Sequence, residues 1–145
     1  MRATSQVQYA IYGLFDLAYH GGSGPISIQE VGARQGIPAR YLEHIFQRLR
    51  RAGLISARRG PGGGYQLDRA ASEITLADVI EAVQGTLLAR PSAPESAEGS
   101  PAFVWDDLDR RIRRGLSALT IADLCREAAD HGVERRATAP ASYQI

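Results

Sequence analysis

Apolar residues recur at helical spacing along most of the first half of the chain. Over residues 4–20 they cover more than one face, which predicts a helix that is buried on two sides. The glycine-rich segment 21–25 ends this helix. Ser27 and Glu30 then have the spacing of a capping box, in which the serine hydroxyl accepts from a helical N–H and the carboxylate turns back. This pair predicts a short second helix that ends before Gly36.

A third helix is expected from Pro38 to about Ala52, since a proline is tolerated in the first turn of a helix. Its apolar face consists of Leu42, Ile45, Phe46 and Leu49. After this helix the apolar period shortens to that of a strand. Segments 54–58 and 65–67 predict a hairpin, with the glycine-rich segment 60–64 as its tip.

The second half of the chain predicts a fourth helix that Thr75 with Asp78 starts and Gly85 ends. After a loop, two further helices are expected over 103–119 and 120–132, and Thr120 with Asp123 starts the second of them. The loop is longer than those of most compact domains and is rich in Pro, Ser, Ala and Glu. These patterns divide the chain into a first domain, a loop, a pair of terminal helices and a flexible tail, over 1–85, 86–102, 103–132 and 133–145.

Two helices joined by a tight turn and followed by a two-stranded hairpin are typical of a winged helix-turn-helix. We therefore expect a mainly α fold of the α+β class, with a DNA-binding domain over 1–85 and a long C-terminal dimerisation helix. In this motif the N-terminal residues of the second helix of the pair reach base edges in the major groove. The candidate readers lie off the apolar face of the third helix: Ala39, Arg40, Tyr41, Glu43, His44 and Gln47.

These residue types suit direct readout, because Arg can bridge two acceptors of guanine, Glu can accept from cytosine and Gln can pair with adenine. Arg48, Arg50 and Arg51 are better placed for phosphates. Arg58 and Arg59 lie at the wing tip, where an arginine can enter the minor groove. The alternative is that this arginine cluster is only a solvated helix face.

The run Gly-Pro-Gly-Gly-Gly at 60–64 resembles a phosphate cradle, but no Lys-Ser/Thr follows it and the next element is a strand. We interpret it instead as a hairpin tip that needs positive φ angles and close backbone approach to DNA. Four of its residues therefore join the candidate DNA contacts: Gly60, Pro61, Gly62 and Gly63.

Composition narrows the class of protein further. The 145 residues include one cysteine, and all 17 basic residues are arginine. A disulfide framework and chemistry that requires lysine are therefore excluded. No apolar run reaches the roughly 20 residues of a membrane-spanning helix, and no secretory signal is visible. We expect a cytoplasmic protein with no membrane partner.

The net charge of +1 conceals an asymmetry between the two halves. Residues 1–70 hold nine arginines against four acidic residues, whereas residues 71–145 hold eight arginines against twelve acidic residues. A basic first half and an acidic second half indicate that only one part of the surface meets a polyanion. Statistical scatter is the alternative explanation.

Several motifs together resemble the Rrf family of bacterial winged-helix repressors. They are Arg2, Tyr9-Ala10, Asp16-Leu17-Ala18, Tyr41-Leu42-Glu43, Leu49-Arg50, RGPGGGYQL at 59–67, ITLADVIEAVQG at 74–85 and WDDL…LTIADL within 105–124. The resemblance covers nearly the whole chain. It implies a homodimer that binds double-stranded DNA at a palindromic operator, senses redox or iron–sulfur status, and has Arg2 and Ser27 among its DNA contacts.

The resemblance also implies that the 103–119 helix crosses its twin in the dimer. An apolar face with no other element left to cover it agrees with this, and the residues on it are Trp105, Leu108, Ile112, Leu116 and Leu119. A monomer in which this helix folds back on the first helix is the alternative. Three acid-first pairs at i,i+4 should stabilise the helix: Asp106–Arg110, Asp107–Arg111 and Asp109–Arg113.

The chain departs from the family at the cluster ligands. Family members that hold an iron–sulfur cluster usually have three cysteines in the loop before the long helix, whereas 86–102 has none. Serines stand there instead, at Ser92, Ser96 and Ser100, and a further ligand position of some members is Gln8. With these residues at the ligand positions, the chain is expected to hold no metal. A [2Fe–2S] cluster, or less readily a [4Fe–4S] cluster, is expected only if the cysteines are restored. Either the lineage lost its cluster, or serines were substituted for cysteines to mimic the cluster-free protein.

The rival function is a winged-helix interaction module whose basic side binds an acidic protein. An enzyme is not expected. Cys125 and His131 supply fewer than the four ligands of a structural zinc site and lack the third group that a Cys–His dyad needs. We expect Cys125 to be a half-buried helix residue, with a thiol switch as the alternative.

Overall fold

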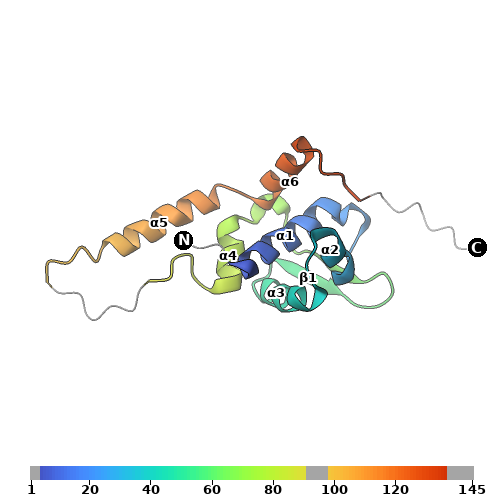
Figure 1. Ribbon diagram of the computed structural model, residues 1–145, viewed down its shortest axis with the longest axis horizontal. Coiled ribbons are helices and arrows are strands. Elements are labelled where there is room, and N and C mark those ends of the chain that lie inside the picture. The colour runs from blue at the N-terminus through green and yellow to red at the C-terminus, as the bar shows by residue number, and fades with distance from the viewer. Residues whose placement is uncertain (1–3, 91–97, 137–145) are drawn as a thin grey trace, which may run out of the picture.

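Helix α1 (Ser5–His20) lies at the centre of the fold (Figure 1). The computed structural model describes residues 4–90 and 98–136. Thr4 caps the helix, and its hydroxyl accepts from the N–H of Val7. Helices α2, α3, α4 and α6 all pack against α1. This arrangement confirms that the first helix is buried on more than one side.

Helices α2 (Ile28–Gln35) and α3 (Ala39–Arg51) form the helix-turn-helix. Gly36 ends α2 in the left-handed conformation at φ 68°. The Ser27 hydroxyl accepts from the N–H of Glu30, as predicted. The returning half of the capping box was wrong, because the Glu30 carboxylate accepts hydrogen bonds from Arg34 and Arg136 instead.

Strands β1 (Ile55–Arg58) and β2 (Gly64–Leu67) form the antiparallel wing, with Ile55 opposite Leu67 and Arg58 opposite Gly64. Ile26, just before α2, extends this sheet by one residue. Its N–H donates to the carbonyl of Tyr65 at 2.9 Å, and the Tyr65 N–H donates back at 2.8 Å. The wing is therefore tied to the start of the helix-turn-helix, a pairing that the sequence pattern did not predict.

Two of the predicted helix starts form complete capping boxes. Thr75 with Asp78 begins α4 (Leu76–Gln84), and Thr120 with Asp123 begins α6 (Ile121–Asp130). The two cap residues also pair with each other across an isolated antiparallel bridge. Short 3-10 turns, η1 (Gly21–Ser23) and η2 (Ala71–Glu73), lie in the connections.

The main core lies between α1, α2, α3, α4 and the wing, with Leu14, Phe46 and Val79 among its fully buried side chains. A second, smaller apolar cluster contains Val7, Ala77, Ile80 and Leu87. These two clusters and the hairpin confirm a mainly helical winged-helix fold.

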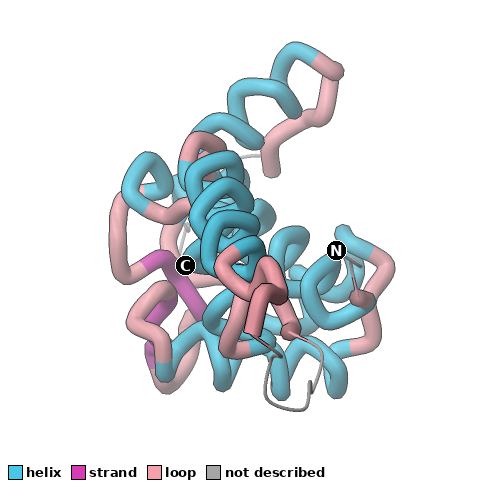
Figure 2. The backbone as a smooth tube through the Cα atoms, turned by 90° about the vertical axis from the view of Figure 1, so that its left-hand side faces the viewer, coloured by secondary structure: helices cyan, strands magenta, loops and turns pink. Residues whose placement is uncertain are grey.

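Helix α5 (Val104–Ser117) extends away from this body and has no buried residue (Figures 1 and 2). Only Ile112 and Leu116, towards its C-terminal end, pack against the second apolar cluster. The Arg113 guanidinium pairs with Glu81 of α4. The predicted Asp107–Arg111 pair forms, but Asp106 pairs with Arg90 instead of Arg110. Within the part of the chain that the structure describes, no helix could cross a membrane.

Candidate nucleic-acid interface

The two sides of α3 differ sharply in polarity. Leu42, Ile45, Phe46 and Leu49 are buried against the core, as predicted. On the opposite side Glu43, His44 and Gln47 are exposed. Ala39 is half-buried and packs against the core at the start of the helix. The predicted reading residues other than Ala39 thus lie on one open surface.

Tyr41 organises the N-terminal end of this surface. This residue is 44% exposed, and its ring stacks on the ring of Tyr9 from α1, with the centroids 6.3 Å apart. The guanidinium of Arg40 lies over the same ring, 4.9 Å from its centroid, and donates to the Tyr41 hydroxyl at 3.1 Å. The aromatic pair therefore holds Arg40 at the edge of the helix where base contacts are expected.

The arginines that follow are open. Across residues 4–90 and 98–136, Arg50, Arg51, Arg58 and Arg59 take part in no ion pair and no side-chain hydrogen bond. Segment 39–67 holds six arginines and one acidic residue, Glu43. We refer to this surface as the basic face, and it consists of Arg40, Glu43, His44, Gln47, Arg50, Arg51 and residues 58–63.

The wing tip explains why its glycines are needed. Gly60 and Gly62 have φ angles of 96° and 73°, and a Cβ atom on either would meet open space. A Cβ on Gly63 would overlap the carbonyl oxygen of Arg58, and one on Gly64 would overlap the backbone of Ile26. The predicted positive φ angles are confirmed at Gly60 and Gly62. At Gly63 and Gly64, however, the close backbone approach is made to the protein itself.

A cavity of about 340 Å³ lies beside the basic face, between α1 and α3. It is lined by Gln6, Tyr9, Tyr41, His44, Ile45, Gln47, Arg48 and Arg51. The N-terminal end of α1 therefore lies next to α3 and belongs to the same surface. Sequence reasoning assigned no role to Gln6 or Tyr9 here, because their proximity to α3 is a tertiary contact.

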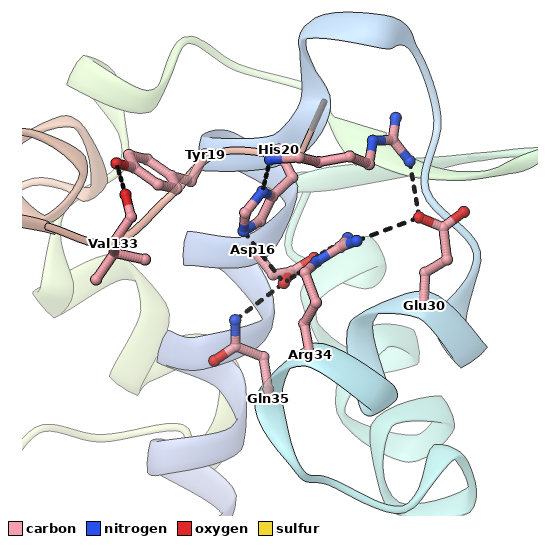
Figure 3. A network of polar contacts seen from close by, with 8 residues as sticks. Asp16, Tyr19, His20, Glu30, Arg34, Gln35 and Val133 are labelled. Atoms are coloured by element: carbon pink, nitrogen blue, oxygen red, sulfur yellow. Dashed lines mark hydrogen bonds and ion pairs between the residues drawn. The ribbon is translucent and has the colours of Figure 1, made fainter. Parts of the chain in front are cut away.

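A second polar cluster lies at the other end of α1 (Figure 3). Asp16 is completely buried, and its two carboxylate oxygens accept from Arg34 at 2.8 and 2.9 Å. The Gln35 amide donates to the same carboxylate at 2.9 Å. These bonds join α1 to α2 and fix the first helix of the helix-turn-helix. A charged residue in an otherwise apolar stretch of α1 was the signal for this cluster, but its partners could not be read from the sequence.

His20 links this cluster to the C-terminal segment 133–136, which we call the strap. The backbone N–H of Arg136 donates to Nδ1 of His20 at 2.7 Å, and the Tyr19 hydroxyl donates to the carbonyl of Val133. Burial lowers the pKa of His20, Asp16 opposes that shift, and the nearby arginines reinforce it. We refer to Asp16, His20, Glu30, Arg34, Gln35 and Arg136 as the polar network.

Only two of the positions expected for cluster ligands fall within the residues that the structure describes. Gln8 and Ser100 are exposed, whereas Ser92, Ser96 and the expected DNA contact Arg2 lie outside the described residues. The residues that the structure describes contain no group of three His, Cys, Asp or Glu side chains that could hold a metal ion. Cys125 is half-buried on α6, where burial raises the pKa of its thiol.

The residues expected at a dimer interface divide into two sets. Ile112 and Leu116 already pack within the chain, so the prediction that no element covers this helix was too broad. Leu108 is 37% exposed and Phe103 is 75% exposed. Trp105 and Leu119 are half-buried. The N-terminal half of α5 therefore keeps an apolar surface that is open to a partner.

Comparisons with known proteins agree with this geometry. Residues 3–127 match the model of the Rrf2 family, described as an iron-dependent transcriptional regulator. The helix-turn-helix transcriptional regulator IscR of Photorhabdus laumondii is 42% identical over 129 residues, which are 86% of this chain and 79% of that protein. IscR of Serratia proteamaculans is 41% identical over the same shares of both chains. These relatives are transcriptional regulators and not enzymes.

Solved structures show the same fold. IscR of T. potens superimposes with a TM-score of 0.74 at 29% identity, over 94% of each chain. CymR, the global cysteine regulator of B. subtilis, superimposes with a TM-score of 0.72 at 28% identity, over 88% of this chain and 98% of that one.

Proposed function

Because this chain belongs to the Rrf2 family of transcriptional regulators, we propose that it acts as a homodimer on a palindromic operator. Each protomer presents α3 to one half-site, with the two half-sites about one duplex turn, roughly 34 Å, apart. The observation that carries the proposal is the row of arginines that flanks the exposed polar side of α3 and has no partner among the described residues. Binding to chromosomal DNA would place the protein in the cytoplasm.

Within the basic face we assign separate roles to the helix and the wing. Arg40, Glu43 and Gln47 read base edges in the major groove, since their donors and acceptors match those of the bases. Arg50 and Arg51 bind phosphates, and Arg58 and Arg59 enter the minor groove or bind its phosphates. Tyr41, His44, Gly60, Pro61, Gly62 and Gly63 complete the surface. Arg2 and Ser27 are kept as expected contacts, with Ser27 also capping α2.

The dimer forms through α5. Leu108 within this helix and Phe103 at its N-cap are open apolar residues, and the helix projects beyond the body of the protomer. The helix is acidic in its first half, with three aspartates over 106–109, and basic in its second half, with four arginines over 110–114. An antiparallel crossing places opposite charges against each other, which favours a second copy of this helix as the partner. The two-fold symmetry of such a dimer matches a palindromic operator.

We propose that this form works as a repressor without an iron–sulfur cluster. Cluster iron in proteins is bound mainly by cysteine thiolates, and the sequence contains only Cys125, on α6. The hydroxyl of Ser100 and the amide of Gln8 are poor iron ligands. The residues present therefore do not fit the group, and we derive no step through it.

The first test is the selection of bound duplexes from a random DNA pool at about 150 mM salt. Recovery of an inverted repeat with half-sites about one turn apart would support the dimeric regulator. No enrichment over background would contradict the proposal and favour the alternative, binding to an acidic partner protein.

Sedimentation of the free protein and of a Leu108→Glu variant tests the dimer, because a buried glutamate at the crossing should shift the variant to monomer.

A second test concerns the cluster. The chain purified under anaerobic conditions with added iron and sulfide should have no visible absorption from a cluster. The triple variant Ser92→Cys, Ser96→Cys and Ser100→Cys should gain that absorption. A cluster on the unaltered chain would contradict the cluster-free proposal. Intact mass compared with translation of the source gene decides whether the serines are natural.

A further inference from the structure

Arg48 differs from the other arginines of α3 in its contacts. Its Nη1 donates to the backbone carbonyl of Val83 at 2.8 Å and to Oε1 of Gln6 at 3.0 Å. Arg50 and Arg51, two and three residues further on, make no side-chain hydrogen bond among the described residues. By sequence alone all three are equivalent candidates for phosphates. The structure directs one of them towards the protein.

The Val83 carbonyl needs a donor from elsewhere. It lies in the last turn of α4, where the final four carbonyls of a helix have no partner within the helix. The Gly85 N–H is used by the carbonyl of Glu81. A guanidinium at this end also interacts favourably with the helix dipole. Because Val83 is a buried residue, an unpaired carbonyl there would be costly. Arg48 therefore acts as the C-terminal cap of a neighbouring helix.

The helix that Arg48 caps is the one that holds α5. Glu81 of α4 pairs with Arg113 of α5, and Ile80 lies in the same apolar cluster as Ile112. The second acceptor, Gln6, lies next to Val7 in the first turn of α1, and Val7 belongs to that cluster too. A continuous set of contacts thus runs from α3 through Arg48 to α4, α1 and α5.

We propose that Arg48 is a positioning residue that fixes α3 relative to α4 and α5, and so determines which half-site spacing the dimer accepts. This inference rests on the proposed function. In a dimer joined through α5, the distance between the two α3 helices depends on how each protomer holds α3 against α4 and α5. Loss of the Arg48 contacts loosens that arrangement without removing a contact to DNA.

The test compares Arg48→Gln with Arg51→Gln, which removes the same charge one turn away from a side chain that has no hydrogen bond among the described residues. Both variants and the wild type are titrated with the selected operator and with operators lengthened or shortened by one base pair between half-sites. Arg51→Gln should make the slope of log affinity against log salt concentration less steep by about 1, and it should keep the spacing preference. Arg48→Gln should keep the salt dependence and reduce the spacing preference by roughly 2- to 30-fold.

Two further variants keep the inference testable if Arg48→Gln unfolds. Arg48→Lys retains the charge on a single donor nitrogen, so it should restore part of the spacing preference. Gln6→Ala removes only one acceptor and should weaken the preference in the same direction by a smaller factor. Thermal melts of every variant set a temperature at which all are folded.

Three outcomes would overturn the inference. A less steep salt dependence in Arg48→Gln, equal to that of Arg51→Gln, would identify Arg48 as a phosphate ligand. An unchanged spacing preference in a folded Arg48→Gln would leave it a stabilising residue only. If the wild type selects no operator, the proposed function fails and the inference fails with it. If the wild type selects one and only the variants disagree, the inference alone is wrong.

Discussion

The arginines at the two ends of α1 differ in their exposure and in their partners. On the basic face Arg50, Arg51, Arg58 and Arg59 are exposed and have no partner among the described residues. In the polar network the Arg34 side chain is only 27% exposed and gives two hydrogen bonds to the buried Asp16. One set of guanidinium groups is open to a polyanion, and the other is already neutralised inside the protein.

This difference shows that a count of arginines does not locate a DNA-binding surface. A guanidinium that is paired with a carboxylate offers little net charge to phosphates, because its field is cancelled locally. The acidic residues next to each group of arginines determine how much positive charge that group offers to a polyanion. The basic face has one acidic residue, Glu43, whereas the polar network has Asp16 and Glu30. Substitutions at the two regions should therefore separate into effects on stability and effects on binding.

The largest expected effect is on stability, from Asp16→Ala. This variant leaves Arg34 and Gln35 without their acceptor beside a buried site, so we expect the free energy of unfolding to fall by about 2–4 kcal/mol. Urea unfolding measures it. Glu43→Ala is the control, since it removes an exposed carboxylate that has no partner in the described part of the chain, and it should change stability by less than about 0.5 kcal/mol. Equal losses in both variants would contradict the contrast between the regions.

Glu43→Ala should instead alter base preference. A carboxylate that accepts from cytosine discriminates against the wrong base by about 1–3 kcal/mol, and that discrimination should disappear at one position of each half-site. Competition between the selected operator and single-base variants measures it. The overall affinity should change less than the discrimination. A uniform loss of affinity across all sequences would instead place Glu43 outside the base contacts.

Arg59→Ala should lower affinity for every sequence by about 1–2 kcal/mol, because it removes a charged donor at the wing tip. The slope of log affinity against log salt should become less steep by about 1. Arg126→Ala, on α6, removes the same charge from a surface pair with Asp123 and should leave the slope unchanged. If both variants have the wild-type slope, the wing does not bind DNA through Arg59.

Local patterns predicted most of the fold. Capping at Thr75 and Thr120, the left-handed Gly36 and the glycine-rich wing tip all depend on residues within a few positions of one another, and all appear in the structure. The pairing of Ile26 with Tyr65 is also present in the structure, but it could not be predicted from such local patterns, because nothing in either segment specifies the other. Sequence reasoning therefore found the wing but not the strand residue that anchors it.

The same limit applies to the charges. Asp106, Asp107 and Asp109 are each followed four residues later by an arginine, so the sequence predicts the same pairing for all three. In the structure, however, Asp106 pairs with Arg90, and Arg113 pairs with Glu81 of another helix. Arg48 was grouped with the phosphate contacts for the same reason. The basic face could be predicted because exposed side chains follow helix periodicity. The partners within the polar network could not be predicted, because they depend on how α1, α2 and the strap meet.

The smallest expected effect concerns pH and the polar network. Desolvation lowers the pKa of His20 below 6.5, the Asp16 carboxylate raises it, and Arg34, Arg135 and Arg136 lower it further. The unfolded chain therefore takes up a proton more readily than the folded one. Stability is at its full value above pH 6.5 and falls as the pH drops below that value. Protonation also places an N–H on Nδ1, where the ring now accepts from the backbone of Arg136, so acid should break this hydrogen bond between His20 and the strap.

The comparison of wild type with His20→Gln isolates this effect from the carboxylates, which protonate at lower pH. Urea unfolding between pH 7.5 and 5.5 should show a decline in the wild type that the variant loses in part. His44→Gln removes an exposed histidine of the basic face, without a hydrogen bond in the described chain, and should retain the wild-type decline. The amide resonance of Arg136 should shift over the same range only where His20 is present. If His20→Gln and wild type decline alike, the polar network resists acid and the strap is not held by the neutral imidazole.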